Sequence, residues 1–239
     1  MADSLTKNWI PDSEVNMKKI LTLQDIVNSS WGERFHEAFG ENLTAAFLHG
    51  NCLYEGFDAL HESWQVSLIL KSTSPNILQN AHKLSREMFK DNLKFGYFFS
   101  EDFLLKNQTE YPLEFLHISQ KNAPLFGNAP LTGYIPNPEA LRKECKRELE
   151  NRKLHLLREF TRIQAGISPM DFFIESYEEI FPILYGAAYL QNGTYPKSRA
   201  EITQAFPAFE VLEPALDYKQ NVERAENLFA AIDQLIQSL

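Results

Sequence analysis

Two short apolar runs with a polar loop between them carry the residues of this chain that are best suited to chemistry. The loop begins at His49-Gly50-Asn51, directly after the apolar residues 43–48, and the second run covers residues 64–70. Glycine lets a backbone approach phosphate closely, and side chains at positions i and i+2 of a strand point to one face, where paired carboxylates hold divalent metals. The layout is typical of a nucleotide site, but its polar residues are not the expected ones.

The order of these elements resembles that of the nucleotidyltransferase superfamily: a strand that ends in glycine, a loop, and a second strand. The resemblance implies Gly-Ser after the first strand, Asp-x-Asp at the start of the second, and a third carboxylate on a later strand. In this chain Gly50 keeps the glycine position, and Asn51 replaces the serine. Gln65 and Ser67 stand where the two aspartates would be, so both charges of the pair are missing.

Glu114 stands where the third carboxylate is expected, in the apolar run 113–118 that we interpret as a strand. Two neutral side chains and one distant carboxylate make a poor site for Mg²⁺, whose binding depends strongly on ligand charge. We therefore expect no metal site, no cofactor and no working catalytic residue. Gly50, Asn51, Gln65, Ser67 and Glu114 are interpreted as the remains of an active site.

A second resemblance extends over residues 30–165. The segments around Ser100-Glu101-Asp102, Tyr111-Pro112-Leu113-Glu114 and Leu125-Phe126-Gly127 are similar to those of a group of bacterial nucleotidyltransferase-domain proteins of unknown role. This likeness implies the same fold and leaves the function open.

The pattern up to residue 134 predicts alternating helices and strands. A capping box at Thr22-Leu23-Gln24-Asp25 opens a helix that is expected to run to Phe39. Further helices are expected after the caps Ser74 and Ser100, and a third strand over residues 95–99. Such alternation favours a mixed sheet layered with helices.

The residues after position 134 predict helices only. Asn137-Pro138 starts a long helix, Ser168-Pro169 starts a second, residues 198–206 form a third, and the last begins at about Tyr218. We therefore expect an α+β protein with an N-terminal arm (1–20), a nucleotidyltransferase-like domain with a mixed β-sheet (21–134), and an all-α helical bundle domain (135–239).

The composition excludes several classes of protein. The chain has 239 residues, 44% of them hydrophobic, and a net charge of −9 with acidic and basic groups interleaved. Binding to nucleic acid needs a concentrated basic face, which this pattern does not provide. The N-terminus lacks the apolar core of a signal peptide, and no run reaches the roughly 18 apolar residues of a membrane span. We expect a cytoplasmic protein that does not bind membranes.

Two of the histidines, His49 and His117, are expected near the cleft, since each lies at or on a predicted strand beside it. No pair of histidines has the spacing of a metal motif, so both are interpreted as candidates for the lining of the cleft.

Three functions remain open. The leading hypothesis is a transferase-like protein without effective transfer activity, whose cleft binds a nucleotide or another small molecule or serves regulation. The second is an active nucleotidyltransferase whose Mg²⁺ site combines Glu114 with Asp58 or Glu62. The third is a scaffold whose helical domain forms homo-oligomers or binds a protein, with the aromatic residues 171–189 as its contact face.

Overall fold

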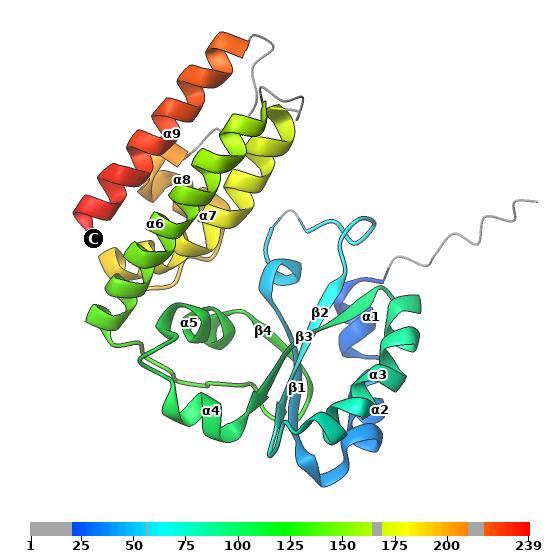
Figure 1. The fold of residues 1–239 in the computed structure, drawn as a ribbon. Helices are drawn as coiled ribbons and strands as arrows, with labels where there is room; N and C mark the ends of the chain where they lie inside the picture. The colour runs from blue at the N-terminus through cyan, green and yellow to red at the C-terminus, as the bar shows by residue number, and fades with distance from the viewer. Residues whose placement is uncertain (1–20, 56, 164–168, 210–217) are drawn as a thin grey trace, which may run out of the picture.

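The computed structural model describes residues 21–55, 57–163, 169–209 and 218–239, and it contains a four-stranded sheet beside a bundle of long helices (Figure 1). This arrangement confirms the expected α+β class, with the mixed sheet in the first part of the chain and, among the residues described there, helices alone in the second. The predicted arm (1–20) and the cap at Ser168 lie outside the described residues.

The sheet has the order β3-β2-β1-β4. Its strands are β1 (Leu43–His49), β2 (Trp64–Leu70), β3 (Leu93–Ser100) and β4 (Asn122–Phe126). β1 is antiparallel to both β2 and β4, whereas β2 and β3 run parallel. The first three strands confirm the predicted apolar runs, and β1 and β2 are the central pair on which the expected site residues stand.

Three helices cover one face of the sheet: α1 (Leu23–Val27), α2 (Trp31–Phe39) and α3 (Pro75–Lys90) (Figure 1). The capping box of Thr22 and Asp25 forms as predicted. The single helix expected to reach Phe39 is wrong, because the chain breaks between α1 and α2. The break falls on Asn28-Ser29-Ser30, whose short polar side chains compete for the backbone, and the Ser29 hydroxyl donates to the Ile26 carbonyl at 2.6 Å.

The opposite face of the sheet is covered by α4 (Glu101–Lys106) and α5 (Pro112–Gln120). Ser100 caps α4 as predicted, since its hydroxyl accepts a hydrogen bond from the Phe103 amide at 3.0 Å. Phe47 of β1, Phe99 of β3 and Phe115 of α5 belong to one buried cluster between the sheet and these helices.

The strand predicted over residues 113–118 is wrong, because this segment forms α5. The helix is buried on two sides: Phe115 and Ile118 face the sheet, while Leu113 and Leu116 pack into the helical bundle. An apolar run without a polar face does not distinguish a buried strand from a buried helix. The fourth strand instead follows α5, as β4.

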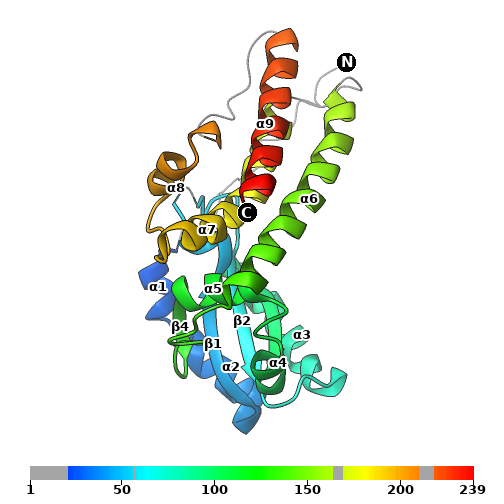
Figure 2. The same ribbon diagram turned by 90° about the vertical axis from the view of Figure 1, so that its left-hand side faces the viewer.

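The second part of the chain consists of α6 (Pro138–Ile163), α7 (Pro169–Asn192), α8 (Arg199–Ala205) and α9 (Tyr218–Ser238). The Asn137 side chain caps α6 by accepting from the amides of Glu139 and Ala140, each at 3.0 Å. Figures 1 and 2 show α9 running alongside α6, with α7 and the short α8 behind them. Short 3₁₀ turns complete the described elements: η1 (Gly40–Asn42), η2 (Gly50–Leu53) and η3 (Pro207–Phe209).

The aromatic side chains of α7 lie in the core of the bundle. Phe172, Phe173, Phe181 and Tyr185 are each at most 4% exposed. They therefore do not form the exposed contact face that the scaffold hypothesis requires of residues 171–189.

α7 approaches α5 and α6 very closely at Gly186. A Cβ atom at this position would lie 2.4 Å from Leu113 Cδ1 and 3.0 Å from Cys145 Sγ. A larger residue here would require the Leu113 side chain to move, because real Cβ contacts are longer.

Within the described part of the chain, no helix combines the length and the apolar character needed to cross a lipid bilayer.

Replacing Gly32 with alanine is expected to destabilise the protein by about 2 kcal/mol or more. The new Cβ would lie 2.0 Å from the carbonyl oxygen of Leu125, which belongs to β4 and cannot move independently of the sheet. Alanine normally stabilises a helix relative to glycine by about 1 kcal/mol. A decrease in the free energy of unfolding would therefore come from the packing clash and not from helix propensity. Urea unfolding followed by circular dichroism measures the change.

Glu37→Ala is the matched control, because Glu37 lies exposed on the same helix. Its free energy of unfolding should stay within about 0.5 kcal/mol of wild type. Equal stability of Gly32→Ala and wild type would contradict the close contact between α2 and β4.

Candidate functional site

Ser67, at the second of the two positions where the sequence resemblance implies a carboxylate, is fully buried, and its hydroxyl makes two hydrogen bonds. The Ser67 Oγ accepts a hydrogen bond from the Tyr97 amide at 2.6 Å and lies 2.7 Å from His49 Nε2. Because the hydroxyl has one proton, the simplest assignment lets it donate to His49 Nε2. The serine is thus a structural link between β1, β2 and β3.

A bulge in β3 makes this link possible. Val66 pairs with Phe95 and Leu68 with Phe98, so Gly96 and Tyr97 together oppose Ser67. A Cβ atom on Gly96 would lie 2.7 Å from both Gln65 Cγ and Ser67 Oγ. The side chains of Gln65 and Ser67 therefore share one face of the sheet, as the spacing predicts, and occupy the space that the glycine leaves open.

His49 connects the buried serine to Glu114. The His49 side chain is 3% exposed, and burial lowers its pKa to about 4, so the imidazole is neutral near pH 7. Its Nδ1 lies 3.9 Å from Glu114 Oε1, which is too long for an ordinary hydrogen bond. The predicted site positions Ser67, His49 and Glu114 thus form one polar row from the sheet to α5.

Glu114 lies in the first turn of α5 and not on a strand, which corrects its predicted setting. It still approaches the sheet on the face that carries Ser67. Burial, together with the nearby Glu144, raises the pKa of Glu114 to about 7. Its side chain remains 35% exposed, and the exposed part faces a cavity.

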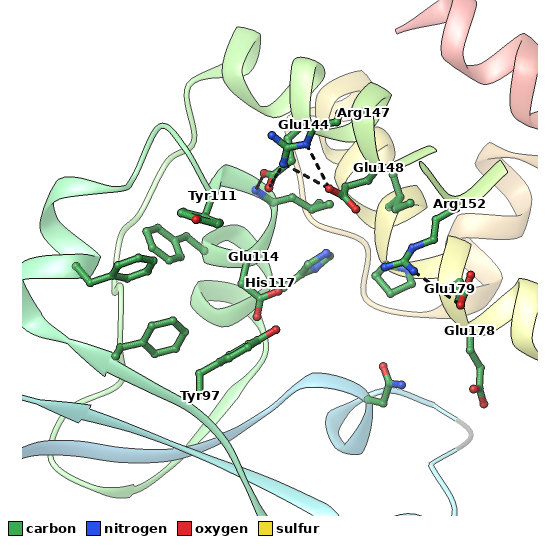
Figure 3. Close-up of a pocket in the computed structure, with 17 residues that line it drawn as sticks. Tyr97, Tyr111, Glu114, His117, Glu144, Arg147, Glu148, Arg152, Glu178 and Glu179 are labelled. Atoms are coloured by element: carbon green, nitrogen blue, oxygen red, sulfur yellow. Dashed lines mark hydrogen bonds and ion pairs between the residues drawn. The ribbon is translucent and has the colours of Figure 1, made fainter. Parts of the chain in front are cut away.

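This cavity has a volume of about 660 Å³ and lies between the sheet, α5, α6 and α7 (Figure 3). Of the predicted site residues, Asn51, Glu114 and His117 line it, whereas Gly50, Gln65, Ser67 and His49 do not. Gly50 has φ +82° and lies close to Gln65, whose Oε1 is 3.7 Å from the position of a Cβ on the glycine. The predicted positions therefore gather in one region, but only part of them reaches the open space.

The wall that α6 contributes is tied to α5 by a buried carboxylate. Glu144 Oε2 accepts a hydrogen bond from the Leu113 amide at 2.6 Å, at the N-terminus of α5, where negative charge is favoured. The guanidinium group of Arg147 lies 3.4 Å from this carboxylate and also 3.4 Å from the carboxylate of Glu148. Burial raises the pKa of Glu144, while the Leu113 amide and Arg147 act against this increase.

His117 lies at the inner end of the cavity, and two tyrosines hold its ring. Its Nδ1 lies 2.7 Å from the Tyr195 hydroxyl and 3.2 Å from that of Tyr54, and the two hydroxyls are 2.5 Å apart. Burial lowers the pKa of His117 to about 4, so the ring is neutral. The cluster joins the segment after β1 to the segment after α7, which are far apart in the sequence.

The residues at the positions that the sequence analysis singled out do not fit Mg²⁺. Ser67 is enclosed and hydrogen-bonded, Gln65 is neutral, and Glu114 stands alone on the far side of His49. Asp58, proposed as a substitute ligand, binds His61 at 2.7 Å and, like Glu62, does not line the cavity. Among the residues that the structure describes, no group of three or more His, Cys, Asp or Glu side chains is placed to hold a metal ion.

Several residues of the site were not identified from the sequence. Gly96 had a usable signal, because an isolated glycine in a strand indicates a bulge or a close contact. Glu144 and Arg147 lie in a segment of interleaved acidic and basic residues, which is typical of a solvent-exposed helix face, and the sequence contains no indication that Glu144 lies against α5. The aromatic lining, which includes Tyr97 and Tyr111, looks like ordinary core in the sequence.

Comparison with known protein-family models finds no match, and comparison with curated proteins finds none either. Among solved structures, the chain is similar to members of the nucleotidyltransferase class. One is a spectinomycin adenyltransferase from Enterococcus faecialis solved with ATP and spectinomycin, with 11% identity over 86% of this chain and 94% of that chain and a TM-score of 0.41. Another is a nucleotidyltransferase-like protein from Exiguobacterium sibiricum, with 12% identity over 89% and 74% and a TM-score of 0.35.

Ser67→Ala is expected to lower the free energy of unfolding by about 1–3 kcal/mol, because it removes the acceptor of the Tyr97 amide and the buried partner of His49 Nε2. Urea unfolding measures the loss. Ser119→Ala is the control, since the Ser119 hydroxyl makes local contacts only: it donates to the Leu116 carbonyl three residues earlier and accepts from the exposed Gln120 side chain at 3.5 Å. A loss no larger than that of the control would show that Ser67 does not hold the strands together.

Glu114→Gln is expected to stabilise the protein relative to wild type, and more at pH 8 than at pH 5. The pKa of Glu114 is raised from 4.5 to about 7 by folding, so the folded state binds more protons than the unfolded state within this window. Its contribution to stability therefore falls as the pH rises from about 4.5 to 7, and glutamine removes this fall. Urea unfolding at pH 5, 6, 7 and 8 measures the difference between variant and wild type.

Glu150→Gln, an exposed change on α6, serves as the control and should follow the wild-type profile. A difference between Glu114→Gln and wild type that is the same at every pH would refute the raised pKa.

Proposed function

We propose that this chain is a nucleotidyltransferase-like protein without metal-dependent transfer activity, and that it binds a small molecule in the cavity between its sheet and its helical bundle. The main support for the missing transfer activity is the burial and hydrogen bonding of Ser67. At the position where the resemblance requires a metal-binding carboxylate, this hydroxyl is buried and engaged by the Tyr97 amide and by His49. A metal ion would have to displace these contacts to reach the position.

The cavity supports the binding part of the proposal. Its volume of about 660 Å³ lies within the range of about 300–1,000 Å³ that small-molecule sites occupy. The lining combines aromatic and aliphatic side chains with a few polar groups, including Glu114 and His117, whose pKa values are shifted by burial. Apolar walls with convergent, perturbed polar groups are typical of binding sites.

The charge of the cavity favours a small molecule other than a nucleoside triphosphate. Five glutamates and two arginines line it, and both arginines already face carboxylates. A triphosphate without its metal ions would meet a surplus of negative charge at short range. We therefore favour the small-molecule alternative over the nucleotide.

Nucleotides with Mg²⁺ are expected to leave the melting temperature unchanged. Thermal unfolding with ATP, GTP, CTP or UTP, with and without Mg²⁺, measures this, since a ligand that binds the folded state raises the melting temperature. Release of pyrophosphate is expected to stay at the level without protein. A rise of several degrees that needs Mg²⁺ and disappears in Glu114→Gln would overturn the proposed loss of transfer activity.

A fragment screen tests the proposal that the cavity binds a small molecule. We expect hits whose addition shifts the backbone amide resonances of β3 and α5, which line the cavity. A shallower hollow of about 450 Å³ between α2 and α3, lined by residues such as Arg34 and Glu87, is an internal control surface. A screen without hits, or with hits on α2 and α3 alone, would overturn the assignment of the cavity as the binding site.

A further inference from the structure

The chemical class of the ligand follows from how the charges in the cavity are already paired. Arg147 lies 3.4 Å from Glu144 and 3.4 Å from Glu148, and Arg152 lies 3.8 Å from Glu179. Figure 3 shows these groups along one wall of the cavity, with Glu114 on the opposite side, toward the sheet. The positive charges of the lining are therefore engaged on α6 and α7, away from Glu114.

Glu114 has no cationic partner within the described ranges of the chain. The basic group nearest to it is His49, at 3.9 Å, and His49 is neutral because burial lowers its pKa to about 4. A carboxylate that faces a cavity without a counter-charge is electrostatically incomplete. A positively charged ligand would complete it.

His117 lines the cavity without offering a polar atom to a ligand. Its Nδ1 faces Tyr54 and Tyr195, which do not line the cavity. Its Nε2 is buried, so a molecule in the cavity does not reach it. Glu114, whose side chain is 35% exposed, is therefore the polar group that a ligand can pair with beside the aromatic wall.

Aromatic rings form the wall next to Glu114. Tyr97, Phe99, Phe103 and Tyr111 follow one another with centroid distances of 5.2, 6.0 and 5.4 Å. Tyr97 is 47% exposed and Tyr111 is 43% exposed, so their rings are available for contact. Such a shelf favours a flat or apolar body and adds cation–π attraction for a nearby positive charge.

We infer that the cavity binds a small organic cation: an ammonium group pairs with Glu114, and a ring lies on the shelf of Tyr97, Phe99, Phe103 and Tyr111. This inference rests on the proposed function and narrows it to one class of ligand. An inorganic cation does not fit, because the carboxylates of the described residues do not converge as metal ligands do.

Three indoles of nearly the same shape test the charge requirement: tryptamine, which is cationic, tryptophol, which is neutral, and indole-3-propionate, which is anionic. Isothermal titration calorimetry at pH 8 is expected to give a dissociation constant for tryptamine that is about tenfold or more below that of tryptophol, because a hydrogen bond to a charged group is stronger than a neutral one. Indole-3-propionate is expected to bind more weakly than either.

Two variants locate the cation. Glu114→Gln should weaken the binding of tryptamine about tenfold and leave the binding of tryptophol unchanged. Tyr97→Ala should weaken the binding of both compounds, since it removes part of the shelf. Glu150→Gln, away from the cavity, should change neither. Circular dichroism confirms that each variant is folded.

The pH dependence gives a readout that a merely structural role of Glu114 would not produce. With the pKa of Glu114 at about 7, its ionised fraction rises about tenfold between pH 6 and pH 8, and tryptamine should bind correspondingly more tightly at pH 8. Glu114→Gln should show a flatter profile. The other titratable or charged groups around the cavity are His49, Tyr97, Tyr111, His117, Glu144, Arg147, Glu148, Arg152, Glu178 and Glu179.

The outcomes separate this inference from the proposed function. Tryptamine that does not bind, or binds no better than tryptophol, overturns the cation inference. If neutral or anionic fragments then bind in the cavity, the small-molecule function stands. Tryptamine binding that Glu114→Gln does not weaken overturns the assigned position of the ammonium group. A fragment screen without any hit in the cavity removes the proposed function itself.

Discussion

The two-sided burial of α5 (Pro112–Gln120) is the constraint on which the rest of the structure depends. One side of this helix packs on the sheet through Phe115 and Ile118, and the other packs into the bundle through Leu113 and Leu116. Glu144 fixes its N-terminus by accepting from the Leu113 amide. Because the same short helix belongs to both cores, the sheet and the bundle have a defined separation, and the cavity lies in the space that α5 does not fill.

Much of the N-terminal fold follows from local sequence signals. The runs that became β1, β2 and β3 have the length and residue types of buried strands, and the caps at Thr22, Ser100 and Asn137 start helices as their side chains predict. The α5 segment could not be assigned in this way. Its apolar residues have partners on both sides, so the polar face that normally distinguishes a helix from a strand is missing.

The candidate site was predictable only in part, and the reason is again physical. Residues 49–67 come together through local strand pairing, so the spacing of Gln65 and Ser67 correctly placed both side chains on one face. The opposite wall comes from α6 and α7, and it meets α5 through packing between segments distant in sequence. No local pattern indicates that the carboxylate of Glu144 turns inward to α5 while the charged residues Lys143 and Arg147 on the same helix remain exposed.

The close approach of α7 at Gly186 has a consequence for the shape of the cavity. α7 supplies Pro182 and Ile183 to its lining, and Gly186 lies one helical turn further on, in contact distance of Leu113 and Cys145. The hydrogen atom that stands in place of a side chain at this position leaves room for the Leu113 side chain, which itself lines the cavity. A methyl group there would force that side chain to move, so the shape of the cavity wall depends on an atom outside the cavity.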